Sequence, residues 1–226
     1  MCIRDRGERV HILADDGEPG ASLSDWLAPH TEDIAAFADT ASLRLSRRLR
    51  HLWPDAFPMA LLPDGEDGLG VVLLNSNADA HFSFTNALGL VSASDVRRLL
   101  GVTALFPKAR WIVAVHHHLV EYPRPAVALS ERIGTALVNG TWLVRQLQPV
   151  ADRIVVMHGH RHVDWIGACS NVRIVSAPSP VMEATGDMPT RFYLHDLLAM
   201  RDGKLGLGRP CAVGLAGAPK DAGPII

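Results

Sequence analysis

Two apolar runs, each ending in histidines, set the strongest limit on the possible folds of this chain. "ARWIVAVHHH" covers residues 109–118, and "DRIVVMHGHRH" covers residues 152–162. Short continuous apolar runs of this kind are typical of strands buried inside a sheet. Because ligands of layered α/β folds gather beyond the C-terminal ends of strands, we expect both groups of histidines to lie at one edge of a sheet.

The rest of the sequence alternates between strand and helix patterns, which favours an α/β fold. Further strands are expected at residues 10–15, 70–77, 171–181 and 190–200, the last followed by a hairpin turn at 201–204. Residues 16–21 are expected to form only a turn.

Helical spacing of apolar residues occurs in three segments. Residues 22–53 predict two helices that break near Pro29, with Ser22 or Ser24 as the N-cap. Residues 92–102 predict a short helix capped by Ser92 or Ser94. The second half of residues 130–150 predicts a third helical segment.

Length and charge limit the class of protein. The 226 residues, 48% of them hydrophobic, suffice for a core in one domain. A net charge of -2 gives no electrostatic reason to expect a nucleic acid or a membrane surface as a partner. The three cysteines are far apart, no apolar run reaches the roughly 18–20 residues of a spanning helix, and no signal peptide is visible. The pattern predicts a reduced, cytoplasmic protein.

The histidines themselves predict a metal site. His160 and His162 are spaced so that both rings can face one ion, and Gly159 between His158 and His160 allows a sharp turn. Neutral imidazole is a ligand for Zn, Fe, Mn or Ni. The alternative is a set of loop histidines that bind no metal. The second histidine group, at another strand end, favours the metal site.

The individual histidines have different expected roles. In "VAVHHH", His116 and His118 share a side and His117 points away if the strand continues, so we expect one ligand and neighbours that support it or contact substrate. His158 is expected to pack or to support a ligand. "HRHVDW" also matches five positions of the H-x-H-x-D-H motif of metallo-β-lactamase-like proteins, but Trp165 replaces the last histidine.

Taken together, "VAVHHH", a helix and then "IVVMHGHRH" resemble the C-terminal half of a calcineurin-like metallophosphoesterase over residues 54–200. The resemblance implies a four-layer α/β/β/α sandwich of two mixed sheets, here without its N-terminal strands. It implies metal-dependent hydrolysis of phosphomonoesters or phosphodiesters at a binuclear centre of Fe, Mn or Zn. His116 and His160 match ligands of the second metal, and His162 matches a ligand of the first.

The sequence departs from the family pattern in several places. His118 stands where many members have proline, and the D-x-H, G-D-x-x-D and G-N-H-[DE] motifs have no counterpart. The bridging aspartate and the general acid are therefore not identified. "MCIRDR" at residues 1–6 resembles a translated sequencing adapter, so we expect residues 7–209 to be the C-terminal part of a truncated domain. Residues 210–226 are expected to be a disordered tail, and the chain alone to be inactive or impaired.

Other segments admit a functional and a structural interpretation. Asn75 and His81 are candidates for substrate contact, although a loop that binds its own backbone explains them as well. Asp164 and Trp165 are candidates for supporting the histidines or lining the site, with packing as the alternative.

For the whole protein, the alternative to a hydrolase is a non-catalytic histidine-rich module that binds metal or another protein. The sequence indicates neither the identity of the substrate nor the oligomeric state.

Overall fold

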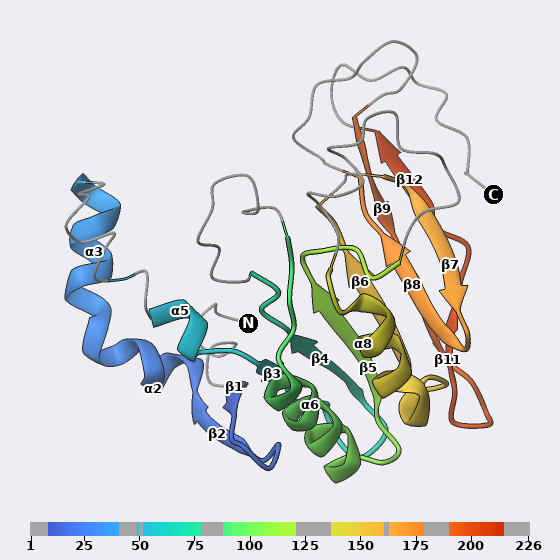
Figure 1. Ribbon diagram of the computed structural model, residues 1–226, viewed down its shortest axis with the longest axis horizontal. Coiled ribbons are helices and arrows are strands. Elements are labelled where there is room, and N and C mark those ends of the chain that lie inside the picture. Colours follow the sequence, from blue (N-terminus) through green and yellow to red (C-terminus); the bar gives the residue numbers. More distant parts are fainter. Residues whose placement is uncertain are drawn as a thin grey trace. The chain divides into compact units, whose positions relative to one another are not determined.

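The computed structural model describes residues 9–40, 49, 52–77, 88–120, 137–160, 163–178 and 190–214 (Figure 1). The chain divides into two compact units. Unit 1 comprises Met1–Asn75 and Val91–Trp111, and unit 2 comprises Ser76–Leu90 and Ile112–Ile226. Among the described residues, no helix has the length and apolar character needed to cross a membrane.

Unit 1 contains four antiparallel strands and several helices. The strands are β1 (Val10–Leu13), β2 (Pro19–Ser22), β3 (Met59–Leu61) and β4 (Leu69–Leu73), in the order β2-β1-β3-β4. The helices are α2 (Leu23–Leu27), a 3-10 turn (Ala28–His30), α3 (Thr31–Thr40), α5 (Leu52–Asp55) and α6 (Ala93–Leu105).

The helix starts in unit 1 confirm the capping signals in the sequence. The Ser22 hydroxyl accepts a hydrogen bond from the Asp25 amide at the start of α2, and Ser92 accepts one from the Asp95 amide at the start of α6. The break at Pro29 is confirmed as well, since this proline lies in the 3-10 turn between α2 and α3.

Residues 16–21 form more than the expected turn. The amide of Ala14 donates to the carbonyl of Glu18, and Gly17 takes a φ of 88°. This tight turn lets β2 pair with β1, although Pro19 and Gly20 are poor strand formers. Pro19 is tolerated because it is the first residue of an edge strand.

Unit 2 is built around β5 (Arg110–Val115, of which Ile112–Val115 lie in this unit), β6 (Ile154–His158), β7 (Trp165–Cys169) and β8 (Val172–Ser176). Their order is β5-β6-β8-β7. β6 and β8 are parallel and β7 and β8 antiparallel, so the sheet is mixed. Helix α8 (Gly140–Leu147) and a 3-10 turn (Gln148–Val150) precede β6.

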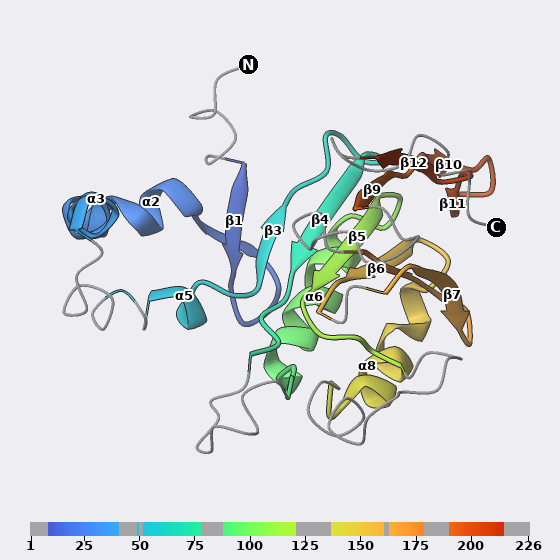
Figure 2. The same cartoon turned by 90° about the horizontal axis from the view of Figure 1, so that it is seen from above.

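Both faces of the unit 2 sheet are covered. Figure 2 shows α8 on one side of β6 and the hairpin of β10 (Leu197–Ala199) and β11 (Leu205–Leu207) on the other. Val155 and Val175 of the sheet form a buried cluster with Leu205 of β11. Each fully buried aliphatic side chain of this kind contributes about 1.5–3 kcal/mol. The α/β class is confirmed, and the described part of unit 2 contains a helical layer, a mixed sheet and two small two-stranded sheets.

Two expectations for the C-terminal region are corrected. Residues 190–200 form two strands, β9 (Arg191–Leu194) and β10, rather than one, because the chain leaves β9 at His195 and Asp196 and β10 then pairs with β11. The stretch from Pro210 contributes β12 (Cys211–Gly214), which pairs with β9. This strand forms by pairing with β9, and the sequence of the stretch has no apolar periodicity that would indicate it. Residues 215–226 lie outside the described residues.

Candidate metal centre

The histidines after β5 begin where the strand ends. β5 stops at Val115, so the alternation expected of a continuing strand does not extend to the three histidines. His116 is exposed, whereas His117 and His118 are each only 2% exposed. His117 does not point away from His116: their ring centroids lie 4.9 Å apart.

Three histidines form a cluster at the ends of β5 and β6, which are neighbouring strands. One nitrogen of each of His116, His117 and His160 lies within 4.8 Å of the other two. His160 Nδ1 is 2.8 Å from His116 Nε2, and the His160 ring centroid is 4.5 Å from that of His117. The expected juxtaposition of the two histidine groups is therefore present in the structure.

The position of His117 is fixed by two residues that the sequence did not single out. Ser76 Oγ lies 2.8 Å from His117 Nδ1 in a buried hydrogen bond, and the same oxygen accepts from the His117 amide. Gly89 packs against the ring so closely that an added Cβ would lie 2.5 Å from His117 Cγ. Ser76 stands between Asn75 and Asn77 in the polar stretch after β4. The polarity of this stretch was the one feature of the sequence that could have pointed to Ser76.

The turn into the cluster is made by His160 itself. His160 has a φ of 68°, in the left-handed region, whereas Gly159 has no positive φ. The sharp turn expected at Gly159 is thus located one residue later. Side chains with a Cβ adopt this conformation at a cost of about 1–3 kcal/mol, and such residues concentrate at functional sites.

His158 and His118 lie beneath the cluster. Both are buried, and their ring centroids are 6.5 Å apart. Burial lowers the pKa of His158 to about 4. The imidazole is consequently neutral at neutral pH, as suits a packing or supporting side chain.

The structure leaves some candidate residues untested. His162, expected to be a ligand, and His81 lie outside the described residues. Asn75 is half-buried at the end of unit 1. Asp164, four residues after His160, is held by a partly buried network: its Oδ2 accepts from Arg191 Nε at 3.0 Å and from the Tyr193 hydroxyl at 2.8 Å.

The cluster has the chemistry of a transition-metal site. Imidazole nitrogens bind Zn²⁺ at about 2.0–2.1 Å, which places tetrahedral ligands about 3.4 Å apart. The three nitrogens lie within 4.8 Å of one another, and the His116 and His160 nitrogens are in hydrogen-bond contact at 2.8 Å. The donor set contains imidazole alone and suits Zn, Fe, Mn or Ni better than Mg or Ca.

Comparisons with known proteins find a similarity in structure but not in sequence. No protein-family model matches the sequence, and no curated protein matches it. The structure is similar to that of a candidate 5′-nucleotidase from Staphylococcus aureus, crystallised in complex with alpha-ketoglutarate. The two chains are 12% identical with a TM-score of 0.39, and the match covers 73% of this chain but 30% of the other. The chain therefore spans less than a third of that protein, and the similarity assigns no activity.

Proposed function

We propose that this chain carries part of the metal centre of a phosphoester hydrolase of the calcineurin-like type. The observation that supports this proposal is the cluster of His116, His117 and His160 at the ends of neighbouring strands. His116 and His160 are the proposed ligands of one metal, Fe, Mn or Zn, and His162 is the proposed ligand of a second. The proposed substrate is a phosphomonoester or phosphodiester.

The chain's own residues have separate roles in this proposal. His116, at the exposed side, and His160, on its left-handed backbone, would hold the metal. Ser76 would orient the His117 ring through the hydrogen bond to Nδ1. A metal ion bound here would supply activation of water and stabilisation of charge on the phosphoryl oxygens.

The test is metal binding together with hydrolysis by the purified full chain. We expect the protein to bind Zn²⁺ or Mn²⁺ and His160→Ala to weaken binding by at least about tenfold, because one of few ligands is lost. His30→Ala, a histidine of unit 1 outside the cluster, should bind as the parent does. Hydrolysis of p-nitrophenyl phosphate and bis-p-nitrophenyl phosphate should be weak, since several family ligands have no counterpart. Equal metal binding by parent and His160→Ala would contradict the proposal.

A second function is supported by the composition of the cluster. Three imidazoles already make a set of ligands for one ion without a bridging carboxylate. The chain would then be a non-catalytic metal-binding module. Tight binding of one ion per chain, lost in His160→Ala, with no metal-dependent hydrolysis of either ester, would favour this function over the hydrolase.

A further inference from the structure

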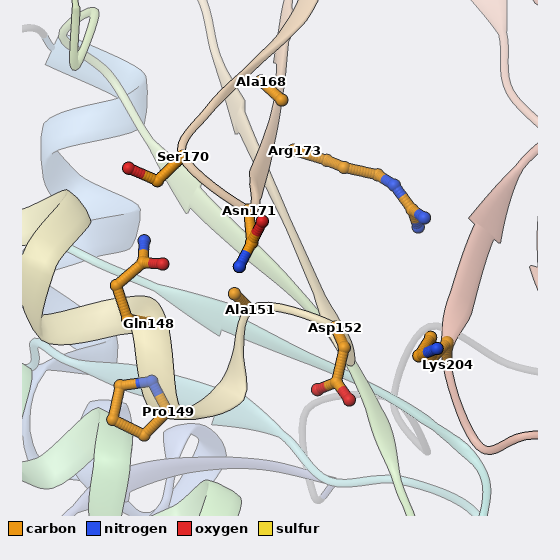
Figure 3. Close-up of a pocket in the computed structure, with 9 residues that line it drawn as sticks. All are labelled: Gln148, Pro149, Ala151, Asp152, Ala168, Ser170, Asn171, Arg173 and Lys204. Atoms are coloured by element: carbon orange, nitrogen blue, oxygen red, sulfur yellow. The ribbon is translucent and has the colours of Figure 1, made fainter.

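A pocket of about 510 Å³ lies in unit 2, at the opposite end of β6 and β8 from the histidines (Figure 3). Its lining residues come from the segment just before β6, from the β7–β8 hairpin, from the start of β8 and from the β10–β11 turn. A volume of this size is within the range of small-molecule sites, roughly 300–1,000 Å³. The pocket shares no residue with the histidine cluster.

Arg173 is the unusual residue of this pocket. It pairs with Val155 of β6 and Ala168 of β7, so its side chain starts from a central strand, on the sheet face that Val155 and Val175 bury against β11. Packing alone would favour an apolar residue there. One guanidinium nitrogen of Arg173 is buried and makes no hydrogen bond to any described residue. A cation in this state lowers stability unless a partner satisfies it.

The pocket around Arg173 contains further charged side chains. Lys204 lines it as well, and Asp152 is the only carboxylate among the described lining residues. No ion pair joins Asp152 to Arg173 within the described structure, although both line the pocket. Lys204 pairs with Asp202 at 2.8 Å, but both side chains are about half exposed, so this pair is weak. An anion is the partner that two such cations accept.

The other end of the pocket carries neutral polar groups. Figure 3 shows the amides of Gln148 and Asn171 on the side away from Lys204. Gln148 Nε2 donates to the carbonyl of Val144, which holds the amide in place and leaves its oxygen as an acceptor. These groups suit hydroxyls of a ligand whose acidic group lies near Arg173 and Lys204.

We propose that this pocket binds a small hydroxylated organic anion, such as a sugar phosphate or a hydroxycarboxylate. Arg173 and Lys204 bind the phosphate or carboxylate group, and Gln148 and Asn171 bind the hydroxyls. This site goes beyond the proposed hydrolase function, because it requires neither a metal nor the histidines.

The experiment is calorimetric titration of the full chain carrying His160→Ala, in the presence of a chelator, with ribose 5-phosphate, citrate and inorganic phosphate separately. We expect saturable binding of ribose 5-phosphate or citrate, weaker binding of inorganic phosphate, and a loss of at least about tenfold in affinity in Arg173→Gln. Preference for ribose 5-phosphate identifies a phosphate ligand, and preference for citrate a carboxylate ligand.

Matched variants make the result decisive. Arg145→Gln removes the same charge from an exposed position on α8 outside the pocket and should leave binding unchanged. Lys204→Gln, at a half-exposed position, should weaken binding even if Arg173→Gln does not fold. The proposal is overturned if neither organic anion binds saturably at up to about 10 mM. It is overturned equally if Lys204→Gln binds as tightly as Arg145→Gln.

Discussion

At the scale of single residues, His160 carries a conflict between backbone and side chain. Its φ of 68° favours glycine, whereas the proposed metal centre uses the imidazole at this position as a ligand. A sequence selected for stability alone would place glycine here. The presence of histidine supports a role for the ring.

This conflict gives a prediction. His160→Gly should be more stable than His160→Ala by about 1–2 kcal/mol, because alanine keeps the Cβ that disfavours the left-handed conformation. Urea unfolding of the two metal-free variants measures the difference. Both variants should lose metal binding to the same extent. Equal stability of the two would mean that the turn is not left-handed in solution.

The sequence predicted the meeting of the two histidine groups but not the details of the cluster. That β5 and β6 end in histidines was visible in the apolar runs. β5 ends at Val115, and the loop that follows it brings His117 beside His116 and His160. This loop conformation depends on the hydrogen bond from His117 to Ser76, which lies 41 positions earlier in the chain. A single sequence contains no signal for a hydrogen bond over such a separation.

At the scale of elements, α6 illustrates what local sequence determines. The serine at its N-cap and the aspartate three residues later define its start. Its end at Leu105 lies three residues beyond the expected Val102, and of the added residues Thr103 is buried whereas Leu105 is exposed. β2 and β12 were missed because pairing with a neighbour rather than local propensity forms them.

The cap of α6 is open to a direct test. Ser92→Ala should lower the free energy of unfolding by about 0.5–2 kcal/mol, because the Asp95 amide loses its acceptor. Ser94→Ala, in the first turn of the same helix, removes only a hydroxyl contact to Ser92 and should have a smaller effect. Thermal unfolding followed by circular dichroism compares the two. A larger effect for Ser94→Ala would assign the cap to Ser94 instead.

At the scale of the whole molecule, stability at high pH depends on the network that joins Asp164 to β9. The Arg191 and Asp164 side chains of this network are only 14% and 19% exposed. Burial, followed by the hydrogen bond to Asp164, raises the pKa of Tyr193 well above its usual range. The unfolded chain therefore loses this proton at a lower pH than the folded chain.

The consequence is a loss of stability at alkaline pH. The contribution of Tyr193 is fully present below about pH 10, the pKa of an unfolded tyrosine, and falls as the pH rises beyond it. Urea midpoints measured from pH 8 upward should fall more steeply above pH 10 in the parent than in Tyr193→Phe, which lacks the ionising hydroxyl. Parallel curves for the two proteins would show that Tyr193 is not buried against a carboxylate.

The separation of 41 positions between Ser76 and His117 also bears on how the protein folds. His116 and His117 are adjacent, but His160 follows His116 by 44 residues, so the contacts of Ser76 and His160 with the cluster are distant in sequence. Contacts of this kind raise the relative contact order and slow folding, since loop closure precedes any gain from the contact. Metal binding would therefore require that unit 2 has folded. A short synthetic peptide spanning "IVVMHGHRH" would not reproduce the site.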